Sequence, residues 1–135
     1  SGYWRTLGFG LPAAMAAKLI QPEKQVVAIV GDGGLQMVLA DLLTATRYGL
    51  NITVVVLNNE SLQMERDKLK VAEKEEVGVD LTNPDFVKLA EACGWKGLRP
   101  ASDSELESVM EEALNTNAPT LVDVRTAQVF FPETN

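Results

Sequence analysis

The residue with the clearest chemical meaning is an aspartate in a glycine-rich turn, Asp32 in the run Gly31-Asp32-Gly33-Gly34. The turn follows an apolar run and precedes an amphipathic one, so its backbone N–H groups favour an anion such as a phosphate. A carboxylate among those N–H groups would repel the phosphate, unless a divalent cation lies between the two. The turn therefore predicts a site that holds a metal ion and a phosphate together.

Further oxygen donors follow a second apolar run. Mg²⁺ prefers about six oxygen ligands in an octahedron. The carboxyl ends of neighbouring parallel strands meet at one edge of a sheet, so the amide oxygen of Asn59 can reach an ion bound by Asp32. The backbone carbonyl of Ser61 would add a third protein oxygen. The predicted metal ligands are Asp32, Asn59 and Ser61, and oxygens of the phosphate and of water complete the shell.

Other phosphate-binding motifs fit this turn less well. It is not the G-x-G-x-x-G fingerprint, because Gln36 stands at the third glycine position, and no G-K-[ST] follows as in a P-loop. A Gly-Asp-Gly or an Asn-Asn pair alone is common in ordinary turns. Their combination is more specific, because both follow apolar runs and one amphipathic helix separates them.

Strands and helices alternate along the chain. Apolar runs predict strands over residues 25–30, 52–57 and 120–124, with a short strand at 95–98. Periodicity and capping patterns predict helices over residues 12–20, 35–48, 84–94 and 102–115, the last two starting with a proline and with a capping box of Ser102 and Glu105. We therefore expect one α/β domain over 1–135: a doubly wound, mostly parallel sheet in three layers, with helices on both faces.

Composition excludes several classes of function. The net charge of −7 and the pI of about 4.6 argue against nucleic acid or an anionic membrane as partner. The absence of histidine excludes a Ser-His-Asp triad and histidine-ligated zinc. Cys93 is the only cysteine and is expected in the core, which favours a reducing, cytoplasmic location. No apolar run is long enough to span a bilayer.

The same residues carry a family resemblance. The stretch GDGGLQMVLADLLTATRYGLNITVVVLNN resembles the signature of thiamine diphosphate (ThDP) enzymes, in which GDG is followed some two dozen residues later by NN. The segments YWRTLGFGLPAAMAAKL, NPDFVKLAEACGWKGLR and PTLVDV extend the resemblance over nearly the whole chain. The chain is similar to the C-terminal, diphosphate-binding domain of the pyruvate oxidase, acetolactate synthase and 2-oxoacid decarboxylase group, which implies the ThDP-binding fold.

The resemblance implies roles for individual residues. Gly33 and Gly34 match backbone contacts to the diphosphate, and Leu62 and Gln63 match positions beside the cofactor and substrate. Leu7, before Gly8, matches the bulky residue that props the cofactor in a V shape; its alternative role is core packing. The Arg5 carbonyl would accept a hydrogen bond from the aminopyrimidine. The predicted cofactor-binding set is Arg5, Leu7, Gly31, Asp32, Gly33, Gly34, Asn59, Ser61, Leu62 and Gln63.

Glu65 has two interpretations. It lies where simple 2-oxoacid decarboxylases carry a catalytic glutamate, which would protonate or orient the intermediate. The rest of the chain is closer to pyruvate oxidases and acetolactate synthases, which generally lack that residue. Alternatively, Glu65 is a solvated charge in the run 65–76, which predicts a mobile, solvated segment. The sequence leaves both open.

The resemblance implies that the chain binds ThDP through Mg²⁺, as the cofactor half of an enzyme that decarboxylates pyruvate or a similar 2-oxo acid. A pyrimidine-binding domain or subunit would supply the activating glutamate, the assembly would be a homo-oligomer, and any FAD of the parent enzyme would bind another domain. Because the chain starts at Ser1 rather than Met, we expect a fragment of a longer enzyme. The alternatives are a cofactor-binding fragment without turnover, and a response-regulator-like phosphate-binding domain, which leaves Asn58-Asn59 unexplained.

Overall fold

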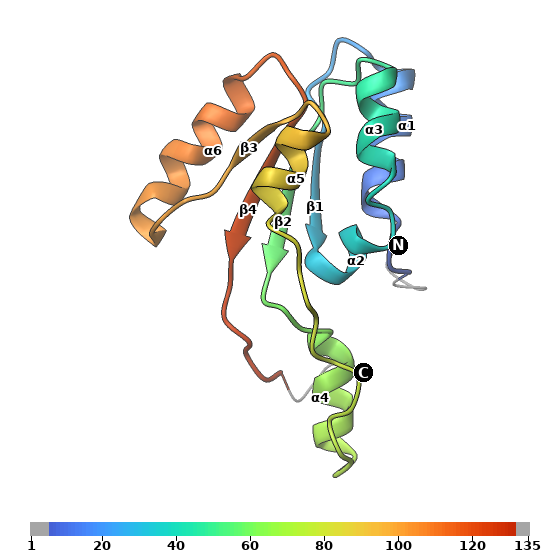
Figure 1. The fold of residues 1–135 in the computed structure, drawn as a ribbon, viewed down its shortest axis with the longest axis vertical. Coiled ribbons are helices and arrows are strands. Elements are labelled where there is room, and N and C mark those ends of the chain that lie inside the picture. Colours follow the sequence, from blue (N-terminus) through green and yellow to red (C-terminus); the bar gives the residue numbers. More distant parts are fainter. Residues whose placement is uncertain (1–5, 132–135) are drawn as a thin grey trace.

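A computed structural model of the chain describes residues 6–131 (Figure 1). Its centre is a sheet of four strands, with spatial order β1-β2-β4-β3. Each pair of neighbouring strands is parallel. The strands are β1 (Val27–Gly31), β2 (Thr53–Asn58), β3 (Lys96–Leu98) and β4 (Thr120–Arg125).

Helices connect the strands and cover both faces of the sheet, which confirms the expected α/β class. They are α1 (Gly10–Ile20), α2 (Asp32–Gln36), α3 (Asp41–Arg47), α4 (Gln63–Val71), α5 (Phe86–Ala92) and α6 (Leu106–Asn115), the last preceded by a 3₁₀ turn, η1 (Asp103–Glu105). Figure 1 shows α6 on one side of the sheet and α1 and α3 on the other. Among residues 6–131, no helix is long and apolar enough to cross a membrane.

The main core lies on one face of the sheet. Side chains alternate between the two faces of a strand, so Val30, Val54 and Leu121 share a face. They pack with the fully buried Leu42 of α3 and Phe86 of α5 in one apolar cluster. The ends of β1 and β2 are held in place by this packing.

The opposite face is covered only in part. There α6 contacts β4, and Val122 of β4 is fully buried. The neighbouring side chains of β1 and β2 stay open: Val27 is 42% exposed, Ile29 69% and Leu57 43%. The structure thus leaves an apolar strip, formed by Val27, Ile29 and Leu57, on this face.

The sequence predicted one continuous helix over 35–48, and this was wrong: the structure has two helices, α2 and α3, in this region. Residues 37–40 form tight turns, with i to i+3 bonds from Val38 N–H to the Leu35 carbonyl (3.0 Å) and from Asp41 N–H to the Val38 carbonyl (3.0 Å). The break leaves both Leu35 of α2 and Leu42 of α3 fully buried. The periodicity therefore found the correct core residues, while packing chose two short helices over one long one.

The predicted caps of the last two helices differ in detail. Asp85, not Pro84, stands at the start of α5, and its carboxylate accepts a hydrogen bond from Val87 N–H at 3.2 Å. Ser102 makes no capping bond with its side chain. Glu105 instead accepts from Ala101 N–H at 3.0 Å. In each case the carboxylate is the acceptor that reaches the free N–H groups, as the chemistry of helix N-termini favours.

The charged run after β2 is more regular than the mobile segment expected there. It forms α4 and then turns back, with Leu62 N–H bonding the Val79 carbonyl (2.8 Å) and Leu81 N–H bonding the Glu60 carbonyl (2.9 Å). Arg66 of α4 pairs with Glu76 at 3.0 Å and with Asp80. The segment that follows Asn59 is therefore held by backbone hydrogen bonds and ion pairs.

Candidate functional site

The carboxylate of Asp32 is buried at the carboxyl edge of the sheet, at the first residue of α2. Its Oδ1 accepts a hydrogen bond from Gly33 N–H (2.9 Å). Its Oδ2 accepts from Glu60 N–H (2.7 Å) and from the side-chain amide of Asn83 (2.8 Å). Three separate parts of the chain thus donate hydrogen bonds to Asp32, the acid of the predicted phosphate-binding turn.

The turn that carries Asn59 lies against this carboxylate. Gly31 of β1 pairs with Leu57 of β2, so the residues after both strands lie side by side. Glu60 adopts a left-handed backbone (φ 56°) and turns its N–H to Asp32. Asn59 Oδ1 accepts from Ser61 N–H at 3.1 Å. The structure therefore gathers the three residues predicted as metal ligands, Asp32, Asn59 and Ser61, at one edge; their metal role stays a prediction.

The donor set fits a divalent metal held jointly with an anionic ligand. Carboxylate, amide and backbone carbonyl oxygens are the donors that Mg²⁺ prefers. Within the described residues, no group of three or more acidic, histidine or cysteine side chains could hold a metal alone. The anionic ligand would therefore supply much of the negative charge that balances a metal bound at Asp32, and a diphosphate carries enough negative charge to do so.

The glycines of the turn differ in their surroundings. A Cβ on Gly31 would meet no heavy atom within 4 Å, whereas one on Gly33 would lie 2.8 Å from Leu62 Cδ2 and 3.1 Å from Leu81 Cδ1. Leu62 thus lies against the turn at Gly33, and its place beside the cofactor stays a prediction. Gln63 donates to Asp67 Oδ1 at 2.7 Å, within α4.

The predicted cofactor-propping residue lies on the same side of the molecule. Leu7 precedes Gly8, whose φ is +82°, and a Cβ on Gly34 would lie 3.8 Å from Gly8 N. Leu7 is 48% exposed, which argues against the alternative of core packing. Arg5, the other residue predicted from this segment, lies outside the described residues.

Glu65 lies in the first turn of α4 and is exposed. Its carboxylate pairs with Lys68 Nζ at 2.9 Å, three residues along the same helix. This geometry suits the interpretation as a solvated charge. A catalytic role for Glu65 stays a prediction.

Sequence reasoning missed a buried polar chain beside the site. Asn58 and Asp123 are both buried, and the Asn58 amide donates to Asp123 Oδ1 at 2.8 Å. Asp123 Oδ2 accepts from Arg99 Nε (2.9 Å) and from an Arg99 terminal nitrogen (2.7 Å). The signal was present in the sequence, because an acid inside the apolar run TLVDV needs a partner when it is buried.

Arg99 extends this chain to α5. It also donates to Asp85 Oδ1 at 2.7 Å. Burial lowers the pKa of Arg99, but the hydrogen bonds to Asp123 and Asp85 outweigh that and raise it. The hydrogen bond from Arg99 lowers the pKa of Asp85. The guanidinium therefore links the N-cap of α5 to the carboxyl end of β4.

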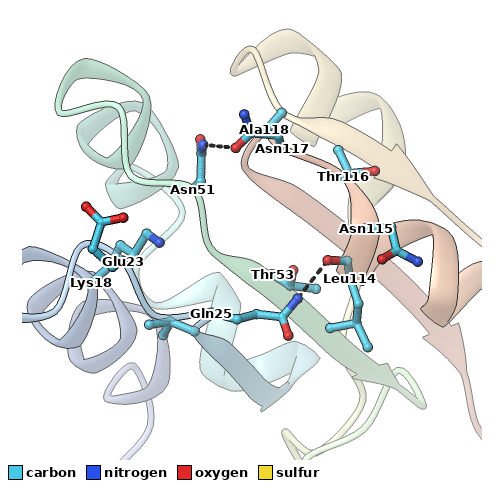
Figure 2. Close-up of a pocket in the computed structure, with 11 residues that line it drawn as sticks. Lys18, Glu23, Gln25, Asn51, Thr53, Leu114, Asn115, Thr116, Asn117 and Ala118 are labelled. Carbon is cyan, nitrogen blue, oxygen red and sulfur yellow. Dashed lines mark hydrogen bonds between the residues drawn. The ribbon is translucent and has the colours of Figure 1, made fainter.

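A separate hollow of about 350 Å³ lies at the amino ends of the strands (Figure 2). Two hydrogen bonds cross it: Asn51 donates to Asn117 at 3.0 Å, and Gln25 donates to the Leu114 carbonyl at 2.7 Å. It lies at the opposite end of the sheet from Asp32 and the other proposed metal ligands. We assign it no ligand.

Comparison with known proteins shows the family to which the chain belongs. The family model "Thiamine pyrophosphate enzyme, C-terminal TPP binding domain" matches residues 1–124. The chain is 44% identical over 124 residues to YdaP of Bacillus subtilis (strain 168), and 40% identical over 127 residues to the acetolactate synthase large subunit of Haemophilus influenzae (strain ATCC 51907 / DSM 11121 / KW20 / Rd). Each match covers 92% of this chain but only 22% of the relative.

A solved structure gives the same result. The thiamine diphosphate-dependent 4-hydroxybenzoylformate decarboxylase of Rhodococcus jostii RHA1 superimposes with a TM-score of 0.83 at 36% identity. The superposition covers 94% of this chain and 24% of the decarboxylase chain. Fold, motif and sequence similarity agree, and this chain belongs to the thiamine pyrophosphate enzymes, as a C-terminal ThDP-binding domain of the acetolactate synthase and 2-oxoacid decarboxylase type.

Proposed function

We propose that this domain holds ThDP through Mg²⁺, as the cofactor half of an enzyme that decarboxylates pyruvate or a similar 2-oxo acid. The observation that carries the proposal is the contact between Asp32 Oδ2 and Glu60 N–H at 2.7 Å, which joins the GDG turn to the NN turn. Relatives named as acetolactate synthase and as a ThDP-dependent decarboxylase support the reaction class.

In this proposal each part of the site has a distinct task. Asp32, the Asn59 amide oxygen and the Ser61 carbonyl hold the metal, while backbone N–H groups of Gly33 and Gly34 at the start of α2 bind the diphosphate. Bound ThDP supplies the electron sink for decarboxylation. Leu62, which lies against Gly33, would help to keep water from the bound diphosphate and so strengthen the electrostatic contacts there.

A second candidate is a cofactor-binding domain without turnover of its own. The acids next to the site are already engaged: Glu60 pairs with Arg125 at 2.7 Å and Glu65 pairs with Lys68. Neither is placed as a free acid toward the turn. An activating glutamate would come from a pyrimidine-binding domain or subunit, as the family resemblance implies.

Calorimetric titration of the chain with ThDP tests the proposed site. With Mg²⁺ present we expect saturable binding; with EDTA in its place we expect none, because the anionic diphosphate then faces the Asp32 carboxylate. Thiamine, which lacks the diphosphate, serves as the ligand control and should not bind measurably. Equal binding of ThDP with and without metal would contradict the proposal, and so would no binding in either case.

We also propose that the domain functions in an oligomer, in the cytoplasm. The apolar strip of Val27, Ile29 and Leu57 supports association, since contiguous exposed apolar surface favours burial against a partner. Cys93 is a free, buried thiol, which suits a reducing compartment. Sedimentation at rising concentration should show a mass above that of one chain. A constant monomer mass at every concentration would rule the association out.

A further inference from the structure

The side chain of Asn83 joins the two motifs of the proposed site. Its Nδ2 lies 2.8 Å from Asp32 Oδ2 and also 2.8 Å from Asn58 Oδ1. Asn83 is half-buried and stands in the loop before α5, far along the chain from both partners. One amide group thus donates to the acid of the GDG turn and to the first asparagine of the NN turn.

The direction of these hydrogen bonds is fixed by the acids at the two ends. A carboxylate only accepts, so Asn58 must present its Nδ2 to Asp123 and its Oδ1 to Asn83. Asp32 likewise requires a donor from Asn83. The Oδ1 of Asn83 then accepts from the Gln36 side chain of α2. Every polar atom of the Asn83 side chain has a partner, and the amide has one orientation that satisfies them all.

The contact to Asp32 limits how that carboxylate can rotate. Gly33 N–H holds Oδ1, while Glu60 N–H and Asn83 hold Oδ2. One backbone donor, Gly33 N–H, is the next residue along the chain, and the other, Glu60 N–H, belongs to the turn after β2. Among the described residues, Asn83 provides the one side-chain hydrogen bond to this carboxylate. Without Asn83, Oδ2 keeps a single donor and the Asp32 side chain gains rotational freedom.

We propose that Asn83 is a positioning residue of the metal site: it orients the Asp32 carboxylate and ties it, through Asn58, to the buried Asp123. The proposal rests on the proposed function, since it concerns the same site. Partners that orient a metal-binding side chain typically change metal affinity about 10–100-fold when they are removed. The expected effect of losing Asn83 is therefore on the metal more than on the fold.

The test is a calorimetric titration of Mg²⁺ into the chain at saturating ThDP. For Asn83→Ala we expect metal affinity to fall about 10–100-fold, with ThDP binding restored at saturating Mg²⁺. Asn83→Asp has the same size but replaces the donor by an acceptor that repels Asp32, so its metal affinity should fall further. Asn51→Ala is the matched control, because it removes an asparagine–asparagine bond at the other end of the sheet and should leave metal affinity unchanged.

The outcomes separate the possible failures. Wild-type metal affinity in either folded Asn83 variant would overturn the positioning role while leaving the proposed function intact. If ThDP affinity stays low even at saturating Mg²⁺, Asn83 supports the loop and not the metal, and the proposal is likewise overturned. If the wild-type chain binds neither Mg²⁺ nor ThDP, both proposals fail. Circular dichroism establishes that each variant is folded, and either variant alone suffices for the comparison.

Discussion

Asp32→Ala is expected to abolish Mg²⁺-dependent binding of ThDP. The substitution removes the one charged ligand of the predicted metal site, so the loss should exceed the roughly 10–100-fold that removal of an outer partner costs. Without the metal, the start of α2 offers only backbone N–H groups to a diphosphate that carries several negative charges. Calorimetric titration with ThDP and Mg²⁺ measures the effect directly.

The variant needs a control for folding, because Asp32 also accepts hydrogen bonds from Gly33, Glu60 and Asn83. Each buried donor left without an acceptor costs about 1–3 kcal/mol. Asp32→Asn keeps the size of the side chain and an oxygen acceptor but removes the charge, and it should bind metal as poorly as the alanine variant. Asp103→Ala, at an exposed acid of η1, is the matched control and should bind normally. Full metal-dependent binding by folded Asp32→Ala would eliminate the proposed site.

Asp123→Ala is expected to destabilise the fold by about 3 kcal/mol. The carboxylate of Asp123 is fully buried and accepts hydrogen bonds from Asn58 and, through two nitrogens, from Arg99. Truncation leaves the Asn58 amide and the guanidinium without their acceptor. The Arg99 side chain is 32% exposed, so it can turn partly to water, which places the cost at the lower end of the range for buried pairs.

Urea denaturation of the purified variant measures this loss, read from the shift in midpoint at unchanged slope. The double variant Asp123→Ala/Arg99→Ala should lose less than the sum of the two single variants, because the two side chains interact directly. Asp103→Ala again controls for the loss of one negative charge. A change within about 0.5 kcal/mol, the range typical of surface substitutions, would show that the buried ion pair does not stabilise the fold.

The two motifs of the site and the sheet that carries them could be predicted because their signals are local. Runs of β-branched residues mark β1, β2 and β4, and the chemistry of Asp32 in a glycine turn calls for a cation between carboxylate and phosphate. A parallel sheet brings its carboxyl ends to one edge, so Asn59 was expected on the same edge as Asp32; the pairing of β1 with β2 then makes them neighbours.

The helices show where local signals stop. The periodicity of residues 35–48 found the buried Leu35 and Leu42, but it could not show that tight turns separate α2 from α3. Periodicity records which side of the chain is apolar, and two short helices can expose the same side as one long helix. The choice between them depends on how the helices pack on β1 and β2.

The polar connections around the site were decided only by the tertiary structure. Asn83 in its loop carries no mark that it will donate to Asp32, and the asparagine before a proline predicts only a turn or a helix start. Arg99 meets Asp123 because β3 and β4 are neighbours in the sheet, a pairing that the order of elements leaves open. Such contacts join residues distant in sequence, and the packing of the sheet and its loops selects them. The sequence alone thus determined which residues could bind a metal and a diphosphate. The tertiary structure determined which other side chains position those residues.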